Sequence, residues 1–449
     1  MKKFIYISIL FLFTACDKEL NVDPTQSLDE TKALATAQDV KVTLIGAYNG
    51  MADGDVYGGG FQFTSELVGD DREVLFRGTF TTLDEMWRKT MTAGNTQVLA
   101  TWRDSYVAIN RANNVLASLD ILDAADKAQV EGEARLIRGS IYLGLVNLFA
   151  KGWGDGDNNT NLGVPIVTAP TRVVTETDSK PRATVSAVYT QILEDLTKAE
   201  QLLPANSSGD NTGFASRNAA TAMLARTYLI QGNYAAARDA AQKVIATGKH
   251  ALSETYADIF DDETGGHETE SVFKIIVTNQ DGVNSLNTYF APAAFAGRGD
   301  IVVQAKHTAL YTPDDPRGKF TVTASNRLYT RKFNNQFGDV IIIRLGELYM
   351  IRAEANFRLG TSVGATPLAD FNLIRTRAGA NPIVQADLTL DRILLERKLE
   401  LMFEGNLLQD IKRLKKPVGT VPSTSPVLLL PIPQREIDTN KSLVQNTGY

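Results

Sequence analysis

The chain contains very little cysteine and histidine, and these shortages exclude several kinds of site. Its 449 residues include one cysteine, so no disulfide can form within the chain. Its three histidines, His250, His267 and His307, stand in unrelated contexts without a metal-ligand spacing. A histidine-based catalytic site or zinc site is therefore not expected, and the stability of the chain must come from the packing of a large core.

Runs of basic residues and long apolar runs are also scarce. The formal net charge is −6, and the one basic run, at residues 412–416, is interpreted as the cationic end of a helix. This charge balance argues against a nucleic-acid partner. Beyond the first residues, no stretch approaches the roughly twenty apolar residues that a membrane-spanning helix needs.

The single cysteine closes a short export signal. Two lysines near the start precede an apolar run of about ten residues at 4–13, which is too short to span a membrane, and small residues then lead to Cys16. We expect residues 1–15 to be a lipoprotein signal peptide. Lipidation of Cys16 would anchor residues 16–449 to a membrane while the body itself stays soluble. The alternative is an ordinary secretory signal with an incidental cysteine.

Hydrophobic periodicity predicts a mainly α fold, a tetratricopeptide-like superhelix of helical hairpins. In the most regular unit, at 217–248, Ala225, Gly232 and Ala237 place small residues where two helices would approach closely. A helix is also predicted across residues 391–415. The predicted scaffold comprises residues of about 30–52, 100–150, 185–250 and 343–416.

Two stretches interrupt the helical period and predict a second, loop-rich lobe. They are residues of about 53–99 and 258–338, with a short strand expected near 271–277 and an aromatic-rich loop at 279–300. Long irregular inserts in a compact chain are usually functional or disordered, and the aromatic content favours an ordered, ligand-binding lobe. Residues 417–449 are predicted to form a C-terminal tail.

Three motifs resemble those of one family. They are the helix around residues 133–135, the Leu-Glu-Leu-Met-Phe-Glu-Gly segment at 399–405, and residues 430–438 with the ending at 446–449. Together with the lipoprotein start, their order and spacing resemble the SusD/RagB family of Bacteroidetes nutrient-uptake outer-membrane lipoproteins. The resemblance covers essentially the whole chain after Cys16, and acidic residues directly after this cysteine resemble a surface-export signal.

The resemblance implies a non-catalytic binding protein. It would be lipid-anchored in the outer membrane, exposed on the cell surface, and would cap a SusC-like TonB-dependent transporter. Such a protein captures a nutrient, most often an oligosaccharide, and releases it into the transporter. Peptide capture by the same fold and a purely scaffolding role are the alternatives, and the chain's three tryptophans keep the peptide alternative open because Trp is favoured for stacking on sugars.

Binding a sugar requires aromatic platforms beside groups that hydrogen-bond to hydroxyls, often on loops that a rigid scaffold supports. Two loop-rich regions supply candidate ligand-binding residues: Tyr57, Asp71, Arg72, Trp87 and Asn95 in the first, and Tyr289, Phe290 and Arg298 in the second. Trp87 could equally be a core anchor, and Asp71 with Arg72 a surface ion pair. On an extended segment Tyr289 and Phe290 would point to opposite faces, so only one of them could line a given pocket.

The remaining acidic residues are expected to be structural. Four charged residues stand at helical spacing, where opposite charges are neighbours: Glu396, Arg397, Glu400 and Glu404. A glycosidase pair would need a carboxyl group with a raised pKa, which nearby arginines oppose, so no catalytic residue is predicted. No cofactor is predicted either. A structural calcium ion at the acidic pairs of 53–55 or 155–157 is the alternative to solvated loops.

Overall fold

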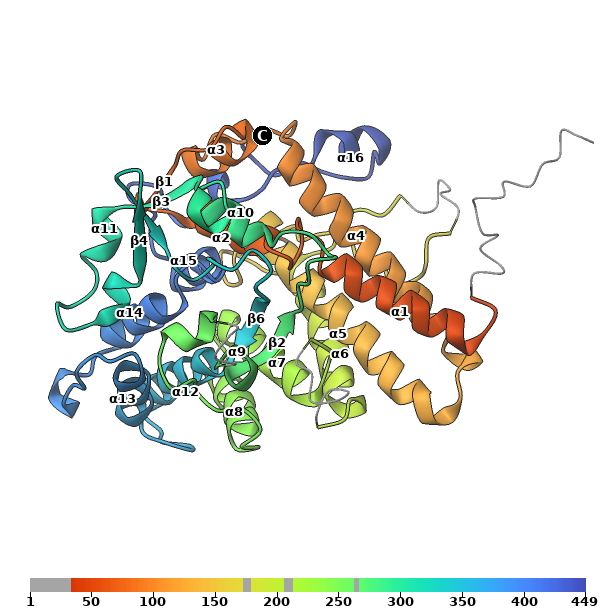
Figure 1. The fold of residues 1–449 in the computed structure, drawn as a ribbon. Coiled ribbons are helices and arrows are strands. Elements are labelled where there is room, and N and C mark those ends of the chain that lie inside the picture. The colour runs from red at the N-terminus through yellow and green to blue at the C-terminus, as the bar shows by residue number, and fades with distance from the viewer. Residues whose placement is uncertain (1–33, 173–178, 206–212, 262–265) are drawn as a thin grey trace, which may run out of the picture.

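Helices make up most of the molecule, which confirms the predicted mainly α fold. The computed structural model describes residues 34–172, 179–205, 213–261 and 266–449 (Figure 1). The helices are α1 (Ala37–Met51), α2 (Gly60–Gly69), α3 (Thr81–Arg88), α4 (Thr96–Leu116), α5 (Ala124–Phe149), α6 (Val185–Leu202), α7 (Arg217–Ile230), α8 (Tyr234–Ile245), α9 (Gly266–Glu270), α10 (Ser285–Phe290), α11 (Ala305–Thr308), α12 (Leu345–Leu359), α13 (Pro367–Arg377), α14 (Leu390–Leu401), α15 (Leu407–Leu414) and α16 (Gln434–Thr439). The strands are β1 (Val74–Phe76), β2 (Ser271–Ile275), β3 (Ile301–Val303), β4 (Thr321–Ala324), β5 (Arg327–Thr330) and β6 (Val340–Arg344). Within these described residues, no helix has both the length and the apolar character of a membrane span.

The long helices form a continuous scaffold in which each packs on the next. The order of packing is α1, α4, α5, α6, α7, α8 and α12, and α12 then contacts both α13 and α14. Small residues permit close approach in this series: a Cβ atom added to Gly139 of α5 would lie 3.1 Å from the Cβ of Asp195 on α6. Polar side chains cap the helix starts through hydrogen bonds to backbone N–H groups, namely Thr36, Asn95, Thr184, Ser216, Asn233, Thr366 and Thr389.

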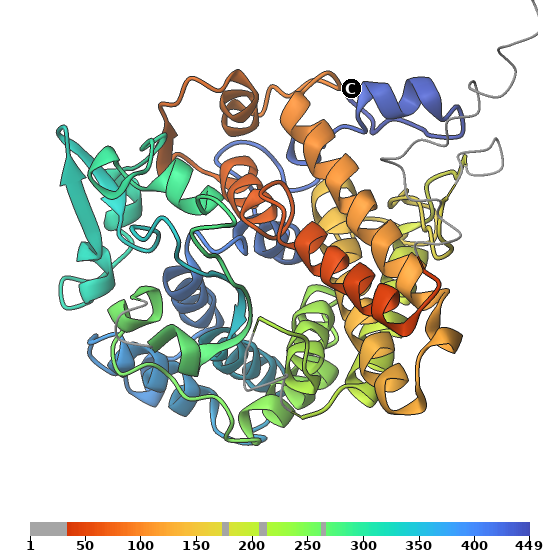
Figure 2. The ribbon, with the colours of Figure 1, turned by 45° about the vertical axis from the view of Figure 1, so that its right-hand side comes forward.

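Two small antiparallel sheets belong to the second lobe. The larger has the strand order β1-β3-β5-β4, with Val74 paired to Val303. The smaller pairs β2 with β6, and its strand β6 leads directly into α12. Figures 1 and 2 show β4 and α11 at one end of the molecule and α1, α4 and α5 at the other.

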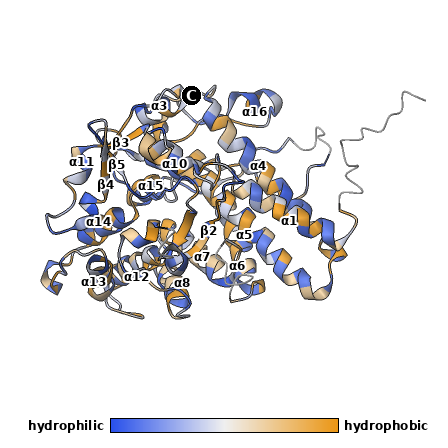
Figure 3. Cartoon of the chain, in the orientation of Figure 1, coloured by the Kyte–Doolittle hydropathy of each residue, from blue (hydrophilic) through white to orange (hydrophobic). Residues whose placement is uncertain are grey.

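One large hydrophobic core runs through the scaffold and continues under both sheets. Hydrophobic and hydrophilic positions alternate along α1 and α4, as expected for helices that bury one side (Figure 3). In α4, one helical face points into this core, because Trp102, Ile109 and Asn113 are buried. A second cluster lies between α12, α13 and α14 and contains Met350, Ala353, Phe371, Ile374, Leu388 and Ile393.

The single helix predicted across residues 391–415 is wrong, because the chain turns between α14 and α15. Phe403 and Gly405 have positive φ angles of 71° and 86°. The backbone N–H of Gly405 donates a hydrogen bond to Glu66 of α2 (2.9 Å), and a Cβ atom on Gly405 would lie 2.8 Å from the Cα of Gln62. Contact with α2 therefore sets this turn, and its local sign in the sequence of 391–415 is the glycine at 405.

The two loop-rich stretches contain more helix than the periodicity predicted. All ten residues of α2 are buried, so this helix has no polar face and no amphipathic period to detect. In the stretch predicted as a loop at 279–300, the side chain of Asn284 caps the short helix α10. Tyr289 and Phe290 consequently lie on a helix, not on the extended segment that was expected.

The C-terminal tail packs against the ends of two scaffold helices. The backbone N–H of Gln434 donates to the carbonyl of Ala93, which places α16 beside the start of α4 (Figure 2). Asn446 donates to the carbonyl of Phe149, the last residue of α5 (2.8 Å), and accepts from Arg182 (2.8 Å). The tail therefore covers the end of α5 and secures the segment that leads into α6.

Candidate ligand-binding site

Three of the predicted ligand residues are buried and stabilise the fold, so we remove them from the candidate site. Tyr57 is 6% exposed and its hydroxyl donates to the carbonyl of Ser140 (2.8 Å). Asn95 is buried as the N-cap of α4. Phe290 is fully buried, with its ring centroid 5.4 Å from that of Phe403. Side chains with these contacts are unavailable to a ligand at the surface.

Three other predicted residues meet in one cleft, which we call the Trp87 cleft. Asp71, Arg72 and Trp87 line a space of about 700 Å³, and the loop at 418–421 forms its other wall. Trp87 is half-buried, and its indole Nε1 donates to Oδ2 of Asp70 (2.9 Å). The indole also packs against the main core. Trp87 therefore packs on the core and lines the cleft at once, and its contact with a ligand stays a prediction.

A tight turn after α2 positions the polar side of this cleft. The buried carboxylate of Asp70 accepts hydrogen bonds from the backbone N–H groups of Arg72, Glu73 and Val74 (2.8–3.0 Å). Burial raises the pKa of Asp70, although these hydrogen bonds oppose the rise. Arg72 is exposed and has a φ of 60°. The expected Asp71–Arg72 pair is not formed, because Asp71 pairs with Lys306 (2.7 Å).

A second group of exposed side chains, which we call the aromatic shelf, consists of Phe80, Tyr289 and Arg298. The guanidinium of Arg298 lies over the Phe80 ring, 4.4 Å from its centroid, and its Nε donates to Asp300 (3.0 Å). Tyr289 approaches Phe80 edge-on at 6.1 Å and is partly buried against Phe63. The shelf thus joins residues from the start of α3, from α10 and from the loop before β3.

Phe80 is the ligand-site candidate that the sequence analysis missed. It directly precedes α3 and is 43% exposed, which is unusual for a phenylalanine. Its position before a helix was visible in the sequence, but its exposure was not. The helical geometry of α10 also explains why the two aromatic neighbours differ, since Tyr289 is partly exposed while Phe290 faces the core.

One acidic cluster has a spacing that suits a metal ion. Carboxylate oxygens of Asp53, Asp55 and Asp104 lie within 4.8 Å of one another. Burial raises the pKa of Asp55, and repulsion by the other two carboxylates adds to this rise despite a hydrogen bond from Gln97. At the other predicted pair, 155–157, a carboxylate oxygen of the second aspartate accepts a backbone N–H in a local turn. Calcium binding stays a prediction for the first cluster.

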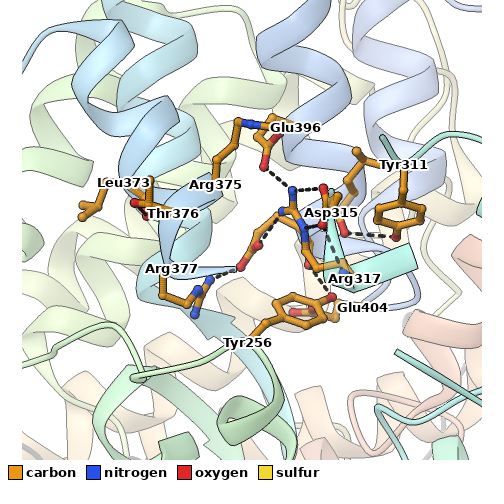
Figure 4. A network of polar contacts seen from close by, with 12 residues as sticks. Tyr256, Tyr311, Asp315, Arg317, Leu373, Arg375, Thr376, Arg377, Glu396 and Glu404 are labelled. Atoms are coloured by element: carbon orange, nitrogen blue, oxygen red, sulfur yellow. Dashed lines mark hydrogen bonds and ion pairs between the residues drawn. The ribbon is translucent and has the colours of Figure 1, made fainter. Parts of the chain in front are cut away.

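The acidic residues of the C-terminal half form a buried network with cations from distant segments (Figure 4). Arg317 donates to Glu396 (2.5 Å) and to Glu400 (3.0 Å). Arg344 joins Glu400 (2.6 Å) to Glu404 (2.8 Å). The network also includes Glu270, Asp315, Lys332, Arg375 and Arg377.

This geometry corrects the expected helical pairing. Arg397, the sequence neighbour of Glu396, pairs instead with Glu347 (3.2 Å) and Asp410 (3.0 Å). Burial alone would raise the pKa of Glu400, but the surrounding guanidinium groups together hold it well below its usual range. A carboxyl group in that state is a poor proton donor. Burial raises the pKa of Glu396, but this carboxyl group is 2% exposed and ion-paired with Arg317 and Arg375, so it too is placed for a structural role.

Two family matches cover most of the chain. Residues 20–229 match a family described as "Starch-binding associating with outer membrane", and residues 316–449 match the SusD family. The chain is 25% identical to SusD-like protein P2 of Formosa agariphila over 522 positions that span 100% of both chains.

Solved structures have the same fold. A SusD superfamily protein of Bacteroides thetaiotaomicron superposes with a TM-score of 0.82 and 25% identity, covering 92% of this chain and 99% of that one. A laminarin-binding SusD-like protein superposes with a TM-score of 0.76 and 24% identity, covering 92% of this chain and 100% of that one.

The chain belongs to the SusD/RagB family, a family of carbohydrate-binding proteins. The resemblance found in the motifs at 133–135, 399–405 and 430–438 is therefore confirmed. In the structure, Glu133 accepts a hydrogen bond from Tyr48 (2.7 Å), and the two C-terminal motifs form the α14–α15 turn and part of the C-terminal tail around α16. The motifs that identify the family thus lie in the scaffold and the tail, and the candidate ligand residues lie outside them.

Proposed function

We propose that this protein is a cell-surface lipoprotein that binds an oligosaccharide and delivers it to a SusC-like TonB-dependent transporter. Membership of a family described as starch-binding and associated with the outer membrane supports the substrate class and the location. Cys16, the proposed lipid attachment site, lies outside the residues that the structure describes. The protein acts by binding alone and requires neither a catalytic residue nor a cofactor.

The aromatic shelf is the observation that carries the proposal. A pyranose ring has an apolar face that stacks on exposed aromatic rings, while its hydroxyls need donors and acceptors at the edge. Phe80 and Tyr289 supply the rings, and the exposed Arg298, which the buried Asp300 holds in place, supplies the polar edge. The guanidinium already lies over Phe80, so a ligand would share or displace this contact.

The Trp87 cleft extends this surface on the other side of α3. Phe80 precedes the helix and Trp87 lies in its last turn, so α3 separates the two groups of side chains. An oligosaccharide long enough to cross α3 would contact both the shelf and the cleft. The polar groups at the second position would be Asp71 and Arg72.

Peptide capture is the second candidate function. The shelf contains Phe and Tyr but no Trp, and Asp71 and Arg72 of the cleft could pair with charged peptide groups. Binding measurements separate the two candidates directly, because each predicts a different panel of ligands.

The test uses the body of the protein, residues 17–449, in isothermal titration calorimetry against α-glucan, β-glucan and peptide panels. We expect saturable binding to one glycan class, weakened at least tenfold by Phe80→Ala and by Trp87→Ala. Val384→Ala is the matched control, since Val384 is 63% exposed and lies far along the chain in the α13–α14 connection. Binding to peptides alone would reject the glycan proposal in favour of peptide capture.

Delivery to a transporter needs a separate experiment. The full chain, expressed with its native signal in a Bacteroidetes host, should copurify with a large outer-membrane barrel protein. A Cys16→Ala variant should lose its membrane association while the body still binds ligand. Retention of the variant in the membrane fraction would contradict lipid anchoring at this cysteine.

A further inference from the structure

The lining of the Trp87 cleft includes two cations that form no ion pair. The side chain of Arg72 is exposed and has no hydrogen bond or ion pair with any described residue. The ammonium group of Lys89 donates to the backbone carbonyls of Asp70 (2.8 Å) and Trp87 (3.3 Å), and it too has no ion pair in the described part of the chain. Carbonyl groups orient a cation but leave its charge in place, so this positive charge is available to a ligand.

Both cations stand at backbone positions that favour glycine. Arg72 has a φ of 60°, and Lys89, the residue that ends α3, has a φ of 61°. Side chains other than glycine are strained in this left-handed region, and glycine is the usual residue at such a helix end. Strained positions of this kind cluster at ligand sites. Long cationic side chains at two strained positions of one cleft therefore indicate a use for their charge.

The two cations are close enough to repel each other. Burial lowers the pKa of Lys89, and the positive charge of Arg72 adds to this lowering, whereas Asp70 and Asp71 oppose it. An anion bound beside both cations would relieve this repulsion.

The carboxylates near these cations already have partners. Asp71 pairs with Lys306 (2.7 Å), and the buried Asp70 accepts from three backbone N–H groups and an indole. Arg88, the third cation of the lining, pairs with Asp84 within α3 (2.6 Å). The lining and these partners together contain four cations and three carboxylates, although the whole chain has a net charge of −6.

We infer that the Trp87 cleft binds an acidic sugar unit, with the carboxylate of a uronate or the sulfate ester of a sulfated sugar at Arg72 and Lys89. This inference rests on the proposed glycan binding and adds the charge of the glycan. Both anionic groups offer several oxygens to the N–H donors of a guanidinium and an ammonium group. The indole of Trp87 and the exposed hydroxyls of Thr90 and Thr420 line the same space, where they suit the sugar ring and its neutral hydroxyls.

The cleft is large enough for such a unit. Its volume of about 700 Å³ falls within the range of about 300–1,000 Å³ that is typical of pockets for small molecules. The aromatic shelf differs in charge, because its cation Arg298 pairs with Asp300 (3.0 Å). A neutral sugar therefore suits the shelf, while the charged unit occupies the cleft.

The test is isothermal titration calorimetry of residues 17–449 with panels of uronate and sulfated oligosaccharides. Each is compared with an uncharged counterpart, the methyl-esterified uronate or the desulfated sugar. We expect at least one acidic oligosaccharide to bind at least tenfold more tightly than its counterpart in about 0.05 M NaCl, and this preference to shrink in about 0.5 M NaCl because salt screens exposed charges. A preference within the uronate panel assigns the bound group as a carboxylate, and one within the sulfated panel assigns it as a sulfate ester.

Two substitutions locate the preference. Arg72→Gln and Lys89→Gln should each remove most of it. Lys249→Gln is the matched control, because it removes the same charge from an exposed site after α8, on the opposite side of the molecule from α3 (Figure 1), and should leave the preference unchanged. Arg72→Gln should also keep the melting temperature of the unaltered protein, since this side chain contacts no described residue through a polar group. A loss of binding in that variant is then a loss of ligand contact.

The outcomes separate this inference from the proposed function. Equal binding of the acidic and uncharged forms would overturn the inference and leave glycan binding intact. A preference that persists in both variants would do the same. If no glycan binds, or if only peptides bind, the proposed function is rejected and this inference with it.

Discussion

Replacing Arg344 by methionine is the most direct test of the buried charge network. Arg344 is 1% exposed and donates to Glu270 (2.7 Å), Glu400 (2.6 Å) and Glu404 (2.8 Å). Its backbone joins β6 to α12, so the network connects the second lobe to the scaffold. Methionine has a similar length but no charge, and would leave three buried carboxylates with too few cations.

The expected loss can be worked out from these contacts. Removing one partner of a buried ion pair costs about 3–5 kcal/mol, because the other charge stays buried without compensation. The entropy of unfolding is about 2.1 cal/mol/K per residue, so each kcal/mol lost from the free energy of unfolding lowers the melting temperature of a chain of this length by about 1 °C. Arg344→Met should therefore melt about 3–5 °C below the unaltered protein at pH 7.

Thermal and urea unfolding followed by circular dichroism measure this loss. The control is Lys127→Met, which removes an exposed pair with Asp120 and should shift the melting temperature by less than about 1 °C. Because the pKa values of Glu400 and Glu404 are lowered in the folded state, their stabilisation is present above about pH 4.5 and is lost as the pH falls. The difference between Arg344→Met and the unaltered protein should shrink below pH 4. Equal melting temperatures of the variant and the control at pH 7 would refute the reasoning.

Three further predictions concern the α14–α15 region. Gly405→Ala should destabilise the protein by at least about 2 kcal/mol in urea unfolding, because its φ is 86° and the new Cβ would meet the backbone of α2. Gly360→Ala is the comparison: its φ is 63° and no described atom lies within 4 Å of the new Cβ, so this change should destabilise the protein by about 1 kcal/mol. Burial lowers the pKa of Lys412 to about 7. Between about pH 7 and 10.5 the unfolded chain therefore binds more protons than the folded chain, and the stability of the fold should rise with pH. The urea midpoints of Lys412→Met should lack this rise. Burial raises the pKa of Glu66 to about 8, so between about pH 4.5 and 8 the folded chain binds more protons than the unfolded chain, and stability should fall as the pH rises. Glu66→Gln should remove this slope while keeping an acceptor for the Gly405 N–H. A slope that persists in Glu66→Gln would assign it to another group.

The scaffold helices were predictable because the information that specifies them is local. Apolar residues repeat at helical spacing in the segments that became α5, α7, α8 and α12, and small residues stand where those helices approach one another. A polar residue that accepts backbone hydrogen bonds precedes several of these helices. Periodicity and capping together depend on a few neighbouring residues, so one sequence is enough to detect them.

The candidate site was less predictable, because burial depends on contacts between distant segments. Tyr57 and Phe290 have the right chemistry for a sugar site, yet each is covered by residues that the sequence gives no means of placing nearby. Asn95 differs, because its role as the N-cap of α4 depends on neighbouring residues. Conversely, Phe80 is exposed because no other segment covers it fully. Composition indicates which residues could bind a ligand, and packing alone selects among them.

The sequence by itself determined the helical scaffold and the family motifs, since each is a short pattern read along the chain, and it predicts the export signal ahead of Cys16 in the same way. The tertiary structure alone decided three things. It bent residues 391–415 into two helices through a contact between Gly405 and Glu66, and it paired the C-terminal carboxylates with Arg317 and Arg344. It also brought Phe80 beside Tyr289 and Arg298. These contacts join residues far apart in sequence, and they exist only once the scaffold has packed.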